Sequence, residues 1–246
     1  MNIHFTDDVL FNELYGYSIF EIEIGSGMYN LKVEGSDEDT LVIYADSILN
    51  PLINRTHHQL QYNEPNQDFI FTSFSQFIQN ILSGDSTINY EVLKHPDFKK
   101  EFPELSSLSI FNNVNVVKSY LGMAKRDIKM YRKSKDIKKA YHIARGILFA
   151  EAVLMNRDIF EVLEENRGLL TTFRSVKADD RIIDDYENKM NRLRDSIKND
   201  VFVMSSSEAY ELEQVMFNIM SKRGQPLSYP FGTLITDAIY EEKFNY

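Results

Sequence analysis

The chain has 246 residues, of which 43% are hydrophobic and 26% charged, a composition typical of a globular protein with enough residues to bury a core. It has no cysteine, which excludes a disulfide framework, a thiolate metal site and a cysteine nucleophile. The net charge of −10 argues against broad nucleic-acid binding, and no apolar run approaches the roughly 18 residues of a membrane span, so we expect a cytoplasmic protein without membrane contact.

The first hundred residues combine extended and helical patterns. Residues 5–15 are predicted to form a short amphipathic helix, with Thr6 as its N-cap. Strands are expected at about 18–24, 40–45 and 67–72, where apolar residues alternate with polar ones or form short runs. Helical periodicity follows at 74–84 and at 89–93. A polar segment with two prolines, 95–103, is where we expect a domain boundary.

The chain after residue 108 is predicted to be helical. The spacing of one buried helix face is shown by Val114, Val117, Leu121, Ala124 and Ile128. A turn at 132–136 leads to a second helix, and further helices are expected at 182–197 and 208–220 before an aromatic-rich tail. These patterns predict an α+β fold, in which a small mixed-sheet domain, residues 1–105, is followed by an α-helical domain, residues 106–246.

Two short motifs in the first domain point to nucleotide chemistry. Gly25 and Ser26 follow the first strand, where a Gly-Ser turn offers backbone N–H groups and a hydroxyl to a phosphate. Asp37 and Asp39 stand two residues apart at the entry to the second strand, so an extended backbone directs both carboxylates to one face. Adjacent carboxylates repel unless a cation lies between them, and their oxygen atoms suit Mg²⁺. Because Asp-x-Asp alone is most often a turn or a cap, the interpretation depends on the Gly-Ser turn and the flanking strands.

These residues resemble the DNA polymerase β-like nucleotidyltransferase superfamily, in which a Gly-Ser turn is followed by Asp-x-Asp. The closer likeness is to a branch of predicted nucleotidyltransferases described as RNA-repair-pathway proteins, some of them phage-encoded. The matching residues of this signature are Gly25, Ser26, Leu31, Ser36, Asp37 and Asp39. A third carboxylate that opens a later strand is matched by Asp68, and a Lys-x-x-x-His-x-x-Arg helix is matched by Lys138, His142 and Arg145. The resemblance covers residues 18 to about 155.

The resemblance implies a Mg²⁺-dependent nucleotidyltransferase that moves a nucleoside monophosphate from a nucleoside triphosphate to a hydroxyl acceptor, with RNA, and tRNA in particular, as the acceptor we favour. A phage-encoded member would act in the host cytoplasm. Two Mg²⁺ ions, or Mn²⁺ in their place, would be held by Asp37, Asp39 and Asp68, with Asp68 nearest the attacking hydroxyl. The nucleotide would be bound by Gly25, Ser26, Ser36, Lys138, His142 and Arg145.

Positive charge is concentrated between Lys118 and Arg145. This stretch has ten lysines and arginines against Asp127 and Asp136, so it carries +8 and the remainder of the chain −18. A solvated helix face would give the same pattern, but beside a predicted metal and phosphate site it also suits contact with RNA or a triphosphate. Within it Lys138, His142 and Arg145 share one helix face, although a single helical histidine is more often structural.

Two alternatives to RNA modification remain open at this point. The same chemistry could modify a protein side chain or a small molecule, and a protein with this fold could bind nucleotides without turnover. The position of Asp68 relative to Asp37 and Asp39 separates an enzyme from a binding protein, because the reaction needs the carboxylates together. Glu38 should point to the opposite face of the strand, and Glu91 could be structural.

Overall fold

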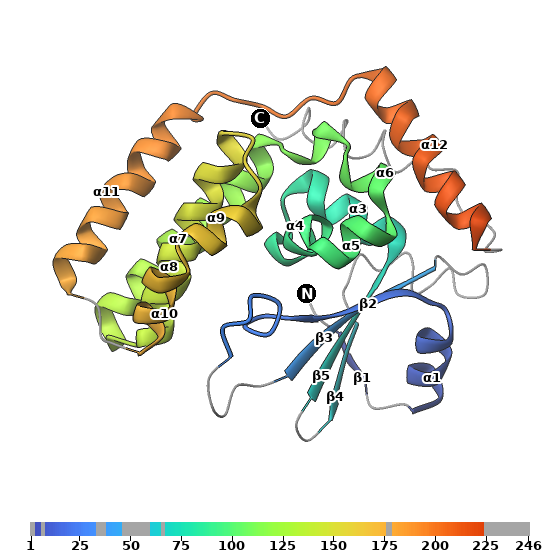
Figure 1. Cartoon of the computed structure of the whole chain (residues 1–246), viewed down its shortest axis with the longest axis horizontal. Helices are drawn as coiled ribbons and strands as arrows, with labels where there is room; N and C mark the ends of the chain where they lie inside the picture. Colours follow the sequence, from blue (N-terminus) through green and yellow to red (C-terminus); the bar gives the residue numbers. More distant parts are fainter. Residues whose placement is uncertain are drawn as a thin grey trace. The chain divides into compact units, whose positions relative to one another are not determined.

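A computed structural model of the chain describes residues 3–5, 8–32, 38–45, 60–64, 67–175 and 179–223. The fold is α+β, as predicted: the described strands all lie before residue 74, and apart from α1 (Asp8–Gly16) the described helices follow them (Figure 1). The described residues form two compact units. The sheet unit contains those within 1–80, 96–108 and 204–246, and the helical unit contains those within 81–95 and 109–203.

A mixed sheet forms the centre of the sheet unit. In the described ranges it has five strands: β1 (Ile3–Phe5), β2 (Ser18–Ile24), β3 (Glu38–Tyr44), β4 (Leu60–Glu64) and β5 (Gln67–Ser73). Their spatial order is β1-β4-β5-β3-β2. β3 is parallel to β5 and β1 is parallel to β4, whereas β2 with β3 and β4 with β5 are antiparallel pairs.

The two faces of the sheet are covered by different helices. On one face, α1 (Asp8–Gly16) places Phe11 edge-on to Phe69, with ring centroids 5.1 Å apart, over a core that includes Val42 and Phe71. On the other face, Phe20 of β2 packs edge-on against Phe98 of α5 (Pro96–Glu101) at 5.0 Å. Three further helices of this unit are α3 (Phe74–Ser83), most of which lies within it, α6 (Pro103–Ser106) and α12 (Ser206–Lys222).

The helical unit is built on a long helical hairpin. α7 (Val114–Ser134) and α8 (Ile137–Leu154) are joined by a tight turn, in which Lys135 adopts a left-handed conformation with φ +55° and Asp136 caps α8. The ring of Tyr120 on α7 meets the ring of Phe149 on α8 edge-on at 5.8 Å. Around this hairpin lie α4 (Thr87–Lys94), η1 (Ser109–Phe111), α9 (Ile159–Glu165), α10 (Arg167–Ser175) and α11 (Asp180–Ser196).

Several sequence-based expectations about local structure need correction. The first helix begins at Asp8 rather than at Phe5, which belongs to β1, and Thr6 lies outside the described residues. β1 and β4 were not predicted. The boundary expected in the polar segment 95–103 coincides with one passage between the two units, at 95/96, but the segment itself is helical: it forms α5 and leads into α6, and it buries Phe98 and Phe102. In the described part of the chain, none of the helices has both the length and the apolar composition that a membrane crossing requires.

Candidate active site

Asp39 and Asp68 are neighbours in the structure. They occupy opposed positions on β3 and β5, and because these strands are parallel and in register, both side chains leave the sheet on the same face. Adjacent strands are about 4.8 Å apart. Both residues are half-buried. The predicted third carboxylate therefore lies directly beside the second one.

The Gly-Ser turn lies beside Asp39, one member of this carboxylate pair. Ile24, the last residue of β2, is paired with Asp39, so the turn begins beside this aspartate. Gly25 has φ +69°, a left-handed conformation that favours glycine, and a β-carbon at this position would lie only 3.7 Å from Asp39 Oδ2. The turn is closed by the Leu31 amide, which donates to the Ser26 carbonyl at 3.0 Å. The backbone of Gly25, which has no side chain, thus lies next to Asp39.

A residue that sequence reasoning missed also contacts this pair. Gln61 on β4 donates from Nε2 to Asp68 Oδ2 at 3.2 Å. Leu60 and Tyr62 pack on the α1 side, so Gln61 and Asn63, which alternate with them, lie on the face of the two aspartates, but a strand of five residues gives too short a pattern to predict this from the sequence. The amide of Gln61 fixes one oxygen of Asp68 and leaves the other to meet a ligand.

Glu38 lies on the opposite face of β3 from Asp39, as the alternation of a strand requires. Its carboxylate accepts from Lys32 Nζ at 3.0 Å, and Lys32 also contacts Glu23 Oε1 at 2.6 Å. This group is a surface ion-pair cluster that binds the start of β3 to the loop after β2. Glu38 therefore provides a nearby carboxylate that is chemically similar to Asp39 but directed elsewhere.

Ser36 and Asp37 lie outside the described residues. Within the ranges that are described, no group of three or more aspartate, glutamate or histidine side chains is arranged to hold a metal ion. The described part of the predicted set is thus the pair Asp39 and Asp68. Two half-buried carboxylates side by side, with hard oxygen donors, fit a divalent cation such as Mg²⁺.

Arg145, predicted to bind the nucleotide, is buried within the helical unit. It is 6% exposed, its Nη1 lies 3.8 Å from Glu91 Oε2, and its guanidinium group lies over the ring of Tyr141. Glu91 is fully buried and also accepts a hydrogen bond from the Tyr120 hydroxyl at 3.0 Å. Arg145 thus belongs to an internal ion pair that joins α8 to α4. Glu91 has a structural role in this pair, which was one of the roles considered from the sequence.

Lys138 and His142 lie on α8 with Arg145, but the three side chains run from the surface to the interior. Lys138 is exposed and His142 is half-buried. Burial, followed by repulsion from Arg145, Lys139, Lys138 and Arg174, lowers the pKa of His142 to about 3. His142 is therefore neutral at pH 7. The spacing correctly indicates one helix, but it does not present three positive charges to solvent.

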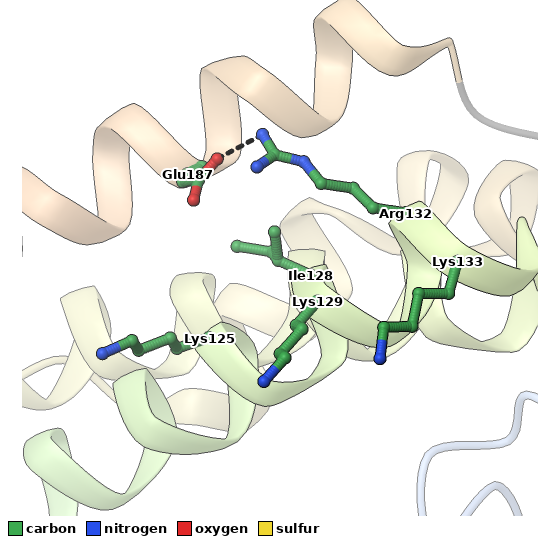
Figure 2. A pocket seen from close by; sticks show the side chains of 6 residues that line it. All are labelled: Lys125, Ile128, Lys129, Arg132, Lys133 and Glu187. Atoms are coloured by element: carbon green, nitrogen blue, oxygen red, sulfur yellow. Dashed lines mark hydrogen bonds and ion pairs between the residues drawn. The ribbon is translucent and has the colours of Figure 1, made fainter.

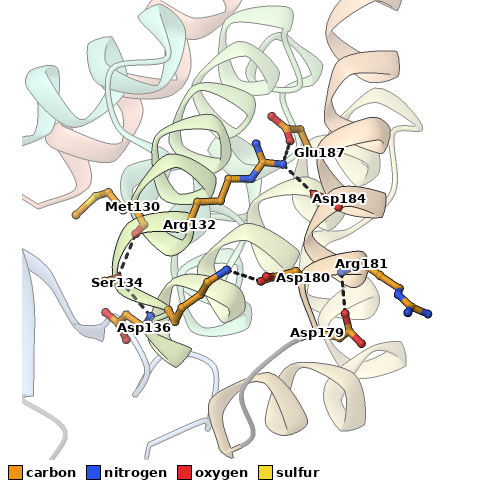
Figure 3. A network of polar contacts seen from close by, with 10 residues as sticks. Met130, Arg132, Ser134, Asp136, Asp179, Asp180, Arg181, Asp184 and Glu187 are labelled. Atoms are coloured by element: carbon orange, nitrogen blue, oxygen red, sulfur yellow. Dashed lines mark hydrogen bonds and ion pairs between the residues drawn. The ribbon is translucent and has the colours of Figure 1, made fainter.

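Two groups of basic residues can be distinguished along α7 and at its C-cap. Arg132 contacts Glu187 and Asp184 on α11, the latter at 2.9 Å (Figure 3). Lys135 contacts Asp180 at 2.5 Å. The other group, Lys125, Lys129 and Lys133, lines a surface groove (Figure 2). Much of the predicted basic stretch is therefore used in packing, and only part of it is available to a ligand.

Comparison of the chain with known proteins identified no relative. No family model, no curated protein and no solved structure matches the chain.

Proposed function

We propose that this protein is a Mg²⁺-dependent nucleotidyltransferase that moves a nucleoside monophosphate from a nucleoside triphosphate to a hydroxyl group of RNA, such as tRNA. One observation carries the proposal: Asp39 and Asp68 are opposed on parallel strands, and the backbone of Gly25 lies against Asp39. A carboxylate pair beside the glycine backbone of a turn offers a cation site next to room for a phosphate.

The reaction forms a bond between the acceptor oxygen and the α-phosphorus and breaks the bond from that phosphorus to the bridging oxygen, so that pyrophosphate leaves. Mg²⁺ held by Asp39, Asp68 and the predicted Asp37 would supply neutralisation of phosphate charge and polarisation of the acceptor hydroxyl. Asp68 takes up the proton of that hydroxyl, because the resemblance places this carboxylate nearest the acceptor. Gln61 keeps Asp68 in position through its 3.2 Å hydrogen bond.

The test is transfer of label from each α-labelled nucleoside triphosphate, in the presence of Mg²⁺, to total RNA. We expect Asp39→Asn and Asp68→Asn each to reduce transfer about 100-fold or more, because a lost metal ligand removes several kcal/mol of transition-state stabilisation. Both substitutions keep the size and shape of the side chain, so the sheet should remain intact.

Glu38→Gln is the matched control, since Glu38 neighbours Asp39 in the chain but points to the other face and pairs with Lys32. This variant should transfer label at the wild-type rate. Transfer that survives in Asp39→Asn would remove the proposed mechanism. Label on protein instead of RNA would favour the second acceptor class, and nucleotide binding without any transfer would favour a binding protein.

A further inference from the structure

One face of α7 carries a row of lysines that point to the same side (Figure 2). This lysine row consists of Lys125, Lys129 and Lys133, one helical turn apart, so successive Cα atoms rise about 6 Å along the axis. All three are exposed. With Ile128, Arg132 and Glu187 they line a groove of about 420 Å³.

The charges of the lysine row are not neutralised by the surrounding described residues. Arg132, on the same helix, is compensated by Asp184 and Glu187 (Figure 3). Lys135 is compensated by Asp180. The lysine row, in contrast, makes no ion pair with a described residue, although Glu187 lies at the groove. The acidic side chains of α11 thus neutralise one part of α7 and leave a linear set of three cations on the other.

We propose that the lysine row binds the phosphate backbone of RNA, and this rests on the proposed function for the choice of RNA among polyanions. Lysine presents a compact cation on a long flexible stem, which can follow successive phosphates without reading their bases. The residues that line the groove include no aromatic side chain, so base stacking contributes little and binding should depend weakly on sequence.

A membrane surface is the less suitable occupant. The apolar lining residue, Ile128, is only 2% exposed, so the groove has no apolar anchor to enter a bilayer. The chain as a whole carries −10, so an extended anionic plane would be repelled by most of the protein. A narrow strand of phosphates can contact the row while avoiding the remainder of the acidic surface.

The test is fluorescence anisotropy with a labelled single-stranded RNA of mixed sequence, titrated with the full chain at several salt concentrations, without triphosphate or metal. We expect the triple variant Lys125→Gln, Lys129→Gln, Lys133→Gln to bind at least 10-fold more weakly at low salt. The slope of log K against log salt should fall in magnitude by about 2, since each phosphate contact to a single strand contributes about 0.7. A triple lysine-to-arginine variant should keep both quantities.

The matched control removes the same charge elsewhere, with Lys100→Gln, Arg192→Gln and Lys198→Gln at exposed positions. It should bind RNA as the wild type does. Equal weakening by the two triple variants, no RNA binding by the wild type, or binding to phosphatidylserine vesicles but not to RNA would each overturn the proposal. If the wild type binds RNA through the lysine row but transfers no label to it, the result counts against the proposed reaction and not against the lysine row.

Discussion

Arg145 and Glu91 show how a single pair decides between two roles for a motif residue. Both side chains are almost fully buried, and the Tyr120 hydroxyl holds one oxygen of Glu91 while Arg145 faces the other. A buried pair contributes little net stability against apolar residues of similar volume, but the loss of one partner leaves an isolated charge in the interior. From its buried position against Glu91, we therefore expect Arg145 to stabilise the fold and not to bind phosphate.

We predict that Arg145→Met lowers the free energy of unfolding by about 3 kcal/mol, because the Glu91 carboxylate then stays buried without its cation. The double variant Arg145→Met, Glu91→Gln should recover most of this loss, since glutamine still accepts from the Tyr120 hydroxyl and carries no charge. Urea unfolding followed by circular dichroism measures both. An unfolding midpoint unchanged in Arg145→Met, together with weaker triphosphate binding, would restore the predicted nucleotide role.

At the scale of the elements, the registered pair of β3 and β5 places two like charges side by side. Opposed like charges in a sheet are destabilising by up to about 1 kcal/mol. A cation between Asp39 and Asp68 would remove this repulsion. The sheet should therefore be more stable with Mg²⁺ than without it, and this gain can be measured apart from any reaction.

We predict that Mg²⁺ at ten times its dissociation constant stabilises the wild type by about 1.4 kcal/mol, as expected for one ligand that binds only the folded state. The double variant Asp39→Asn, Asp68→Asn should be more stable than the wild type without Mg²⁺ and should gain nothing from it. Thermal unfolding in a Mg²⁺ titration, with Glu38→Gln as the control that keeps the gain, makes the comparison. The same Mg²⁺-dependent shift in the double variant would place the ion elsewhere.

The sequence was sufficient for those elements whose signal is local. β2, β3 and β5 have runs of apolar residues, and α7, α8, α11 and α12 have long apolar faces, so the predicted ranges agree with the structure within a few residues. β1 has three residues and β4 five, which is too short for a clear period. These strands are defined by pairing with segments far along the chain, and local pattern does not report such pairing.

The same distinction applies to the candidate site. The residue types, their order and their strands were readable, but the neighbours of each strand were not, so the contact between Asp39 and Asp68 and the hydrogen bond from Gln61 needed the structure. The burial of Arg145 depends on Glu91, which comes from α4, more than fifty positions earlier. Helical spacing in the sequence predicts which residues share a face, but it does not predict which of them contacts another helix.

For the whole molecule, the sequence predicted two consecutive domains, whereas the two compact units interleave along the chain. The chain passes between them at 80/81, 95/96, 108/109 and 203/204. The segments that form α11 and α12 have the same kind of helical sequence pattern, so no local feature of the sequence predicts that the two helices belong to different units. The assignment of α12 to the sheet unit follows from its contacts: Arg223 pairs with Glu101 and lies over the ring of Phe102, and Lys222 pairs with Glu104 at 3.5 Å.

A pair of truncations tests this assignment. A chain that ends at Arg223 keeps every described residue, whereas a chain that ends at Val203 loses α12, four of whose apolar side chains are at most 5% exposed: Leu212, Met216, Ile219 and Met220. Losing their burial removes on the order of 5 kcal/mol, which is comparable to the whole stability of a small domain. We therefore expect the shorter chain to unfold at a lower temperature and to bind an apolar dye such as anilinonaphthalene sulfonate, because the ring of Phe102 loses Arg223 and α6 loses its contact with α12. If α12 were instead an independent appendage, both chains would unfold at the same temperature and neither would bind the dye.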